Sequence, residues 1–490
     1  MTETIRIRKL NDVHLKIECD SGVSYEIGEH FTFNVPGAKF SPAYKNKLWD
    51  GKIRLFHLMR GTLYVGLLSQ LVKFAAERDY IIEYDNPNDF GEDIFSHDTA
   101  LEFIKTLDLP HEVRDYQLSS FINAVRRKRA LFVSPTASGK SLIIFMLAAY
   151  LIQHKVLVIV PTIGLVHQMA SDFVSYGCPE DLIYKIYGGQ EKSTNAFITI
   201  TTWQSIYQQP NTWFKQYGVV VGDEAHQFKA KSLVDIMEKM TSCQYRFGFT
   251  GTLDGTQTNK LVLEGLFGPA EQVTTTAELM SANKVAQLNI KSIVLSHDDA
   301  TRQMFANAKN KLLYKDEIRF LVKSKARNKF LINLVSSLKN NTLLLFNFIE
   351  HGKLLFDAIR DANPNRRVFL VYGMVEGEER EAVRKYAEEN TDVIIVASYK
   401  TFSTGINIPS LENVVFGSPS KSRIRVLQSI GRALRLKDQK LSAKLYDVAD
   451  DISWKSYKNI SIRHFAERIQ MYNQEKFEYN IYTINLKREA

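Results

Sequence analysis

The chain has 490 residues, 45% hydrophobic and 24% charged, which is enough for about three globular domains and argues against long disordered tracts. Its longest apolar run, from Leu142 to Ile152, is too short to cross a bilayer, and the N-terminal MTETIRIRKL has no apolar leader. We therefore expect a cytoplasmic protein without a membrane partner. The net charge of +9 favours a polyanionic partner, although many basic proteins never bind nucleic acid.

Residues 1–88 alternate short apolar runs with turns, as in VSYEIGEHFTFNVPGAKF, and indicate a small α/β domain for substrate recognition. Within it, the stretch 39–60 carries six basic residues against Asp50 alone, interleaved with aromatic residues. Cations neutralise phosphates and exposed rings stack on unpaired bases, but aromatic residues in so small a domain commonly form its core. We expect Trp49 in the core. The candidate nucleic-acid contacts are Lys45, Lys47, Lys52 and Arg54.

A polar, acidic linker is expected at 89–110, and β-rich runs alternate with helix-length stretches in 111–275. These runs are RALFVSP, KVLVIVP, AFITITT, YGVVVGDEAH and YRFGFTGT. Strands that are apolar on both faces and alternate with helices predict a doubly wound parallel sheet. After a helical connector at 276–324, the pattern recurs in 325–452 with NTLLLFNF, RRVFLVYG, DVIIVAS, NVVFGSP and AKLYDVA. A basic, aromatic extension at 453–490 is expected to pack on this second domain.

The stretch SPTASGKS, residues 134–141, begins at the end of the run RALFVSP and leads into an apolar helix. Backbone N–H groups of such a loop can wrap phosphate oxygens, with Lys140 reaching the β and γ phosphates and Ser141 ligating Mg²⁺. The loop departs from the pattern GxxxxGK[ST], because Ser134 occupies the first glycine position; a chance Gly-Lys-Ser turn is the alternative. The expected ATP-binding residues are Ser134, Pro135, Thr136, Ala137, Ser138, Gly139, Lys140 and Ser141.

Two adjacent carboxylates end the buried strand of VVVGDEAH, about 80 residues after the loop. Asp223 can hold Mg²⁺ through water, and Glu224 can polarise the water that attacks the γ-phosphate. Because the pair and the loop fall in one predicted sheet, ATP hydrolysis is favoured over an ordinary acidic turn. FTGT ends the next run, where the hydroxyls of Thr250 and Thr252 are suited to couple the γ-phosphate site to moving parts.

The second domain contains ASYKTFSTGINIP and then QSIGRALR. Arg432 and Arg435 are three residues apart and therefore project from one face of a helix. Arginines from a second domain can complete a phosphoryl-transfer site. A solvated basic face is the ordinary explanation of such a pair, but the spacing QxxGRxxR, with Gln428, favours the catalytic one.

Taken in order, these motifs resemble helicase superfamily 2 across about residues 110–440. The resemblance implies two tandem RecA-like domains, ATP and Mg²⁺ as cofactors, and adenine reading by RDYQ through Arg114 and Gln117. Ala137 departs from the family, because a second glycine is common at its position. The implied catalytic residues are Lys140, Asp223, Glu224, Gln428, Arg432 and Arg435. The implied coupling residues are His226, Thr250, Thr252 and Gly405, and the implied backbone-phosphate contacts are Thr162, Thr202 and Thr404; ordinary cap or turn threonines are the alternative.

The whole chain, including its small N-terminal domain, resembles the bacteriophage recombination helicases of this superfamily. That resemblance implies an ATP-dependent DNA helicase that unwinds or branch-migrates R-loops, stalled forks and Holliday junctions in recombination-dependent replication and repair. The implied partners are branched DNA, single-stranded DNA, RNA–DNA hybrids and possible single-strand-binding proteins, and the implied location is the host-cell cytoplasm. An RNA helicase, a duplex translocase that does not separate strands, and a non-motor binding protein stay open as alternatives.

Overall fold

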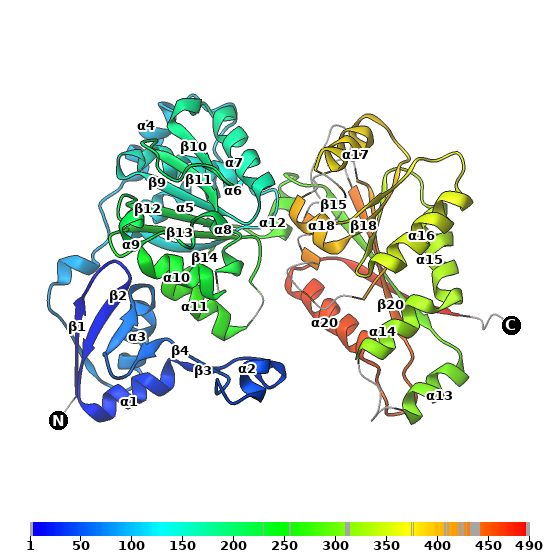
Figure 1. Cartoon of the computed structure of the whole chain (residues 1–490), viewed down its shortest axis with the longest axis horizontal. Coiled ribbons are helices and arrows are strands. Elements are labelled where there is room, and N and C mark those ends of the chain that lie inside the picture. Colours follow the sequence, from blue (N-terminus) through cyan, green and yellow to red (C-terminus); the bar gives the residue numbers. More distant parts are fainter. Residues whose placement is uncertain are drawn as a thin grey trace. The chain divides into compact units, whose positions relative to one another are not determined.

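The structure, a computed structural model, describes most of the chain. The described residues are 3–228, 230–253, 256–308, 314–373, 375, 377–405, 408, 411–419, 422, 426–427, 429–431 and 442–486. They divide into two units, the first drawn from 1–134 and 139–274 and the second from 135–138 and 275–490 (Figure 1). Within these ranges, no helix combines the length and the apolar character that crossing a membrane requires.

The N-terminal domain contains a five-stranded mixed sheet in the order β5-β6-β2-β1-β7. Its strands are β1 (Thr4–Lys9), β2 (His14–Glu18), β5 (Phe56–His57), β6 (Thr62–Tyr64) and β7 (Ile81–Tyr84). Ile5 and Ile7 are fully buried because alternate residues of a strand point to the same face, and this face packs with α1 (Ser21–His30) and α3 (Leu68–Ala76). The small α/β domain expected from the sequence is confirmed.

A separate two-stranded ribbon belongs to the same domain. It pairs β3 (Thr32–Asn34) with β4 (Lys52–Arg54) in antiparallel register. The short helix α2 (Pro42–Lys45) lies in the connection between them, away from the five-stranded sheet (Figure 1). The ribbon and its connection therefore contain the whole basic stretch identified in the sequence, apart from its last residues.

The N-terminal domain packs firmly against the domain that follows it. The carbonyl of Asp12 accepts hydrogen bonds from Arg129 and Arg246, which are themselves buried neighbours on adjacent strands. Tyr64 donates a 2.5 Å hydrogen bond to Glu238. Gly66 lies so close to the next domain that a Cβ atom there would sit 2.0 Å from a backbone carbonyl oxygen. These contacts place the N-terminal domain and the first large sheet in one unit.

The first large sheet has seven parallel strands in the order β10-β11-β9-β12-β13-β8-β14. They are β8 (Arg129–Val133), β9 (Val156–Val160), β10 (Ile183–Ile186), β11 (Ile198–Thr202), β12 (Val219–Asp223), β13 (Tyr245–Thr250) and β14 (Ala270–Gln272). Alternate residues of each strand enter two separate cores: Ala130 and Phe132 pack with one helical layer, Leu131 with the other. The helices are α5 (Asp115–Arg127), α6 (Lys140–Tyr150) and α7 (Ile163–Ser175) on the first face, and α8 (Trp203–Ile206), α9 (Asn211–Phe214), α10 (Lys231–Lys239) and α11 (Gln257–Phe267) on the second.

The range 89–110, expected as a linker, contains a helix that belongs to this domain. Helix α4 (His97–Lys105) packs against α5, with Ala100 fully buried in the same core. Ser96 caps its first turn by accepting a hydrogen bond from the Thr99 N–H at 3.0 Å. This helix was not predicted from the sequence, because acidic and polar residues surround the apolar side chains of its amphipathic pattern.

The second unit contains another seven-stranded parallel sheet, in the order β17-β18-β16-β19-β20-β15-β21. Its strands are β15 (Gln287–Ser296), β16 (Thr342–Phe346), β17 (Val368–Val371), β18 (Ile394–Ser398), β19 (Asn413–Phe416), β20 (Ser442–Asp451) and β21 (Tyr479–Asn485). Its helices are α12 (Thr276–Ser281), α13 (Asp299–Asn307), α14 (Tyr314–Lys323), α15 (Lys325–Ser337), α16 (Ile349–Ala362), α17 (Gly377–Glu389), α18 (Tyr399–Gly405) and α20 (Ile460–Gln474). The α/β class with two doubly wound parallel sheets is confirmed. The range 276–324, expected as a helical connector, also contributes β15 to the sheet, and the tail 453–490 contributes α20 and β21.

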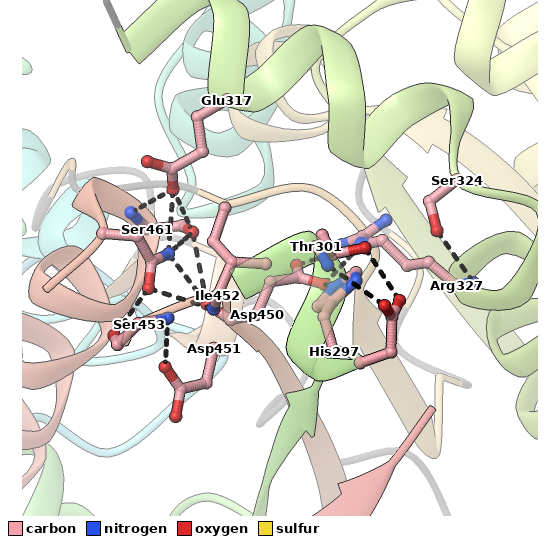
Figure 2. A network of polar contacts seen from close by, with 12 residues as sticks. His297, Thr301, Glu317, Ser324, Arg327, Asp450, Asp451, Ile452, Ser453 and Ser461 are labelled. Atoms are coloured by element: carbon pink, nitrogen blue, oxygen red, sulfur yellow. Dashed lines mark hydrogen bonds and ion pairs between the residues drawn. The ribbon is translucent and has the colours of Figure 1, made fainter. Parts of the chain in front are cut away.

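Buried ion pairs and hydrogen bonds hold this second unit together (Figure 2). Asp450 accepts hydrogen bonds from Arg327 Nε at 2.9 Å and lies 3.2 Å from His297 Nε2. Arg327 also donates to the Gly417 carbonyl at the end of β19, at 2.9 Å. Glu317 on α14 accepts the N–H groups of Ile460 and Ser461 at the start of α20, so a carboxylate satisfies donors that every helix N-terminus leaves free.

Candidate functional site

The phosphate-loop candidate lies between the end of β8 and the start of α6. Its first residue is fixed to the neighbouring strand, because the Ser134 N–H donates to the Thr250 carbonyl at 2.8 Å. Within the loop, the Ser138 hydroxyl donates to the Pro135 carbonyl at 2.7 Å. Two residues have left-handed backbones: Gly139 with φ of 80° and Ala137 with φ of 68°. The sequence carries alanine at position 137, where a second glycine is common. The structure places this alanine in a left-handed conformation that strains any residue with a side chain.

Gln117 joins the upstream element to this loop. It is buried on α5, its side-chain carbonyl accepts the Arg114 N–H at 2.9 Å, and its amide donates to the Gly139 carbonyl at 3.5 Å. A Cβ atom on Gly139 would lie 2.3 Å from the Gln117 amide nitrogen. The close approach explains why glycine precedes Lys140, independently of any phosphate. The guanidinium of Arg114, the N-cap residue of α5, donates to the Tyr116 hydroxyl at 2.6 Å.

The two carboxylates occupy different surroundings at the end of β12. Asp223 is buried, and burial raises the pKa of its carboxyl. Among the described residues, its Oδ1 is one of few buried side-chain oxygens for which no protein hydrogen-bond partner is found. Glu224 has a left-handed backbone with φ of 51°, and its carboxylate lies 3.7 Å from Lys140 Nζ. Strain and an unsatisfied acceptor side by side are typical of functional sites.

These features fit a Mg²⁺ ion, which prefers oxygen ligands and keeps several waters. The free Oδ1 of Asp223 supplies an acceptor for metal-bound water, and Ser141 supplies a hydroxyl at the first turn of α6. The Ser141 hydroxyl is held by the Tyr176 hydroxyl at 2.9 Å, from the C-terminal end of α7. A bound Mg²⁺ would neutralise phosphate charge. Sequence reasoning missed Tyr176, because its contact with Ser141 joins residues 35 positions apart.

His226 connects the carboxylate site to the end of β13. Its Nδ1 lies 3.2 Å from Glu224 Oε2 and 3.1 Å from Thr250 Oγ1. Thr250 donates its own proton to the Thr252 carbonyl at 2.9 Å, so its hydroxyl oxygen is left as an acceptor. Both neighbours of Nδ1 therefore accept, and Nδ1 carries the ring proton. The structure thus brings Lys140, Glu224, His226 and Thr250 into one connected network.

Thr162 and Thr202 lie apart from this network but share a cavity of about 540 Å³. Both begin helices: Thr162 caps α7 by accepting the Leu165 N–H at 3.4 Å, and Thr202 precedes α8 with its hydroxyl 2.9 Å from Ser205. Thr162 therefore has the helix-cap role given above as the alternative to phosphate binding, whereas the Thr202 side chain makes no cap hydrogen bond. The cavity, called here the motor-domain cavity, is also lined by Tyr187, Gly188, Gly189 and Lys192. Sequence reasoning missed these four, which come from the end of β10 and the loop that follows it.

The remaining sequence-predicted residues belong to the N-terminal domain or follow residue 400. Lys45, Lys47, Lys52 and Arg54 are exposed in the N-terminal domain, where Arg54 forms an ion pair with Asp50. Phe56 is core, Trp49 is partly buried with its indole N–H donating to the Lys52 carbonyl at 2.8 Å, and Phe40 is 71% exposed. Thr404 and Gly405 end α18. Gln428, Arg432 and Arg435 lie outside the described residues.

Comparisons with known proteins agree on one family. The family described as DNA helicase UvsW, N-terminal, matches residues 4–85; Type III restriction enzyme, res subunit, matches 110–255; and Helicase conserved C-terminal domain matches 326–437. The ATP-dependent DNA helicase uvsW of Enterobacteria phage T4 is 34% identical over 96% of this chain and 98% of its own length. The crystal structure of T4 UvsW matches 99% of this chain and 100% of that chain with a TM-score of 0.52 and 31% identity. The DNA 3'-5' translocase XPB2 of Sulfurisphaera tokodaii is 23% identical over 67% of this chain and 80% of its length.

Proposed function

Because this chain belongs to the UvsW family of ATP-dependent DNA helicases, within helicase superfamily 2, we propose that it unwinds or branch-migrates branched nucleic acids. R-loops, stalled forks and Holliday junctions are the proposed substrates, in recombination-dependent replication and repair. Single-stranded DNA, RNA–DNA hybrids and a single-strand-binding protein are the proposed partners. The family match extends through the small N-terminal domain, and this observation supports a substrate beyond a plain single strand.

For the ATP cycle, we propose that the loop 134–141 holds the phosphates and that Glu224 orients the attacking water. Lys140 lies 3.7 Å from Glu224, so a γ-phosphate that enters between them displaces an ion pair and frees the carboxylate for the water. Ser141 and Asp223 are the proposed Mg²⁺ residues, and Arg114 and Gln117 the proposed adenine readers. Gln428, Arg432 and Arg435 are proposed to complete the site from the second domain.

Coupling of hydrolysis to movement is proposed to run through His226. When Glu224 turns toward a bound nucleotide, the Nδ1 proton of His226 keeps only Thr250 as an acceptor. Thr250 ends β13 and its hydroxyl donates to the carbonyl of Thr252, so a change in the ATP site is passed to the segment that follows this strand. Thr162 and Thr202, in the motor-domain cavity, are proposed to grip the sugar-phosphate backbone without reading bases, together with Thr404.

The test is the ATPase rate at fixed salt without nucleic acid and with single strands, plain duplex, R-loops and four-way junctions. Stimulation by branched DNA several times stronger than by plain duplex is expected. Lys140→Arg should abolish unwinding and leave DNA binding largely intact, because the lysine is proposed to contact the nucleotide and not the DNA. Stimulation by RNA alone would favour an RNA helicase, and stimulation without strand displacement would favour a duplex translocase.

A further inference from the structure

The two-stranded ribbon of the N-terminal domain has two chemically different faces. Cross-strand pairing sets Thr32 opposite Arg54 and Asn34 opposite Lys52. Because side chains alternate along a strand, these four point to one face, and the residues between them, Phe33 and Ile53, point to the other and pack against the core. The outward face is therefore wholly polar and carries two cations.

Apolar side chains from two other elements line the same space as this polar face, and we call them the apolar wall. Tyr25 comes from α1, and Leu58 and Met59 come from the turn that follows β5. They are 64%, 39% and 94% exposed, respectively. The space that both sets of residues line measures about 640 Å³. We call this space the N-domain groove.

The two cations that line the N-domain groove, Lys52 and Arg54, both belong to the ribbon wall. Asp50 forms an ion pair with Arg54 and accepts the Lys52 N–H at 3.1 Å, so it fixes the end of β4 from outside the groove. Glu29 also lines the groove, on α1 at the side of the apolar wall. A ligand with anionic groups along one edge and flat apolar surface along the other would satisfy both walls. A single nucleic-acid strand has this pattern, with phosphates on one side and unpaired bases on the other.

A duplex fits the groove less well. Its phosphates face outward and its base faces are stacked, so Tyr25 and Met59 would stay exposed to water. The N-terminal domain is also held to the first large sheet through Asp12, Arg129 and Arg246. A strand bound in the groove is thereby kept at a fixed distance from the phosphate loop, which is what a motor needs to pull one strand away from another.

We propose that the N-domain groove holds unpaired nucleotides of the strand displaced at a DNA branch, with bases against Tyr25, Leu58 and Met59 and phosphates at Lys52 and Arg54. This inference rests on the proposed function. It assigns the apolar contacts to Tyr25, Leu58 and Met59 rather than to the aromatic residues of the stretch 39–60. Of those aromatic residues, Phe56 is buried in the core.

The experiment uses the full chain and a forked DNA with 2-aminopurine in one unpaired arm. The test variant is Tyr25→Ser with Met59→Ser, and the matched control is Leu48→Ser, which removes an 81% exposed apolar side chain outside the groove. Loss of base contacts should weaken fork binding about fivefold or more and remove the change in 2-aminopurine emission. The control should behave as the natural protein, and all variants should keep its thermal midpoint, because exposed substitutions rarely alter stability.

The outcomes separate this inference from the function on which it rests. Failure of any DNA to stimulate the ATPase of the natural protein would overturn the proposed function. If DNA stimulates the ATPase normally and the double variant gives the same 2-aminopurine emission change as the natural protein, the groove proposal is wrong and the proposed function stands. An equal signal from 2-aminopurine placed in the paired stem would assign the groove to duplex instead. Lys52→Ala should reduce the salt dependence of fork binding and keep the emission change, since this lysine contacts phosphate.

Discussion

The two large sheets have the same strand order, 3-4-2-5-6-1-7 when strands are counted along the chain within each sheet, but they treat buried charge in opposite ways. In the first sheet, strand five is β12, which ends in Asp223 with an oxygen that has no protein partner. In the second, strand five is β19, which ends in Phe416, and the buried carboxylates lie on the neighbouring β20. There Asp450 is paired with Arg327, and Asp447 with Arg468 at 2.8 Å.

The difference shows that the partners of a buried carboxylate, and not the strand order, distinguish a candidate reactive site from a structural one. A satisfied buried carboxylate is held in one state and serves the fold, because its partners cancel the cost of burying it. A carboxylate left with a free oxygen, beside the strained backbone of Glu224, is ready for a ligand that the protein itself does not supply. Strand order alone would have assigned the two sheets the same role.

The largest expected effect tests whether the first sheet carries the chemistry. Glu224→Gln removes the group proposed to polarise the attacking water and keeps its size. The ATPase kcat should fall by about 10²–10⁴-fold, the usual loss for a general base, and nucleotide binding should persist. Glu180→Gln, an exposed carboxamide substitution on the same domain, is the control. A kcat within tenfold of the natural protein would mean that another residue activates the water.

The second test makes the same substitution at both kinds of carboxylate. Asp450→Asn leaves Arg327 buried without its counter-charge and should lower the free energy of unfolding by about 3–5 kcal/mol. Asp223→Asn removes a buried carboxyl whose pKa burial raises, and should increase stability by about 0.5–2 kcal/mol as activity is lost. Thermal unfolding of the two variants beside the natural protein gives the signs. Two shifts in the same direction would contradict the contrast between the sheets.

The third test is the pH dependence that the second unit should show. His351 is buried, its Nε2 is 2.9 Å from Asn328 Oδ1, and burial lowers its pKa to about 3. The unfolded chain therefore binds a proton below about pH 6.5 that the folded chain does not, and stability falls as pH drops toward 3. Between pH 7 and pH 5 this one group should cost roughly 2 kcal/mol.

His351→Gln keeps a side-chain donor for Asn328 and removes the titration. Its unfolding midpoint should vary less with pH than that of the natural protein between pH 5 and 7, measured by denaturant titration. Parallel pH profiles for the two proteins would show that His351 is not the group responsible. Comparison of slopes is the useful quantity, because the substitution also changes stability at every pH.

The sequence predicted the fold where strands are buried on both faces. The runs that became β8, β9, β11, β12 and β13 consist mainly of apolar and β-branched residues, nearly all of them buried, and each is followed by a helix. Strand β15 was missed because three helices separate it from β16, whereas its counterpart β8 precedes β9 after a single one, apart from one short 3₁₀ turn. Helix α4 was missed because charged residues surround its apolar positions.

The motif residues of the candidate site could be predicted from the sequence, but the residues that contact them in the folded protein could not. Lys140, Glu224, His226 and Thr250 were each identified from short patterns, and the structure brings them within hydrogen-bonding or ion-pair distance. The contact of Ser141 with Tyr176, the sharing of one cavity by Thr162 and Lys192, and the exposure of Met59 depend on chain segments that meet only after folding. No local pattern carries that information.

The smallest expected effect concerns the alanine in the phosphate loop. Ala137 has φ of 68°, a conformation that costs an L-residue about 1–2 kcal/mol and glycine almost nothing. Ala137→Gly should therefore raise stability by about 0.5–1 kcal/mol, after the greater flexibility of the unfolded glycine chain is subtracted. Ala149→Gly, the same substitution within α6, should lower stability by about 0.5–1 kcal/mol. If both variants are destabilised equally, the loop is not held in its left-handed turn by the rest of the fold. Opposite signs would identify Ala137 as a point of backbone strain in the proposed phosphate loop, comparable to Glu224 at the proposed water site.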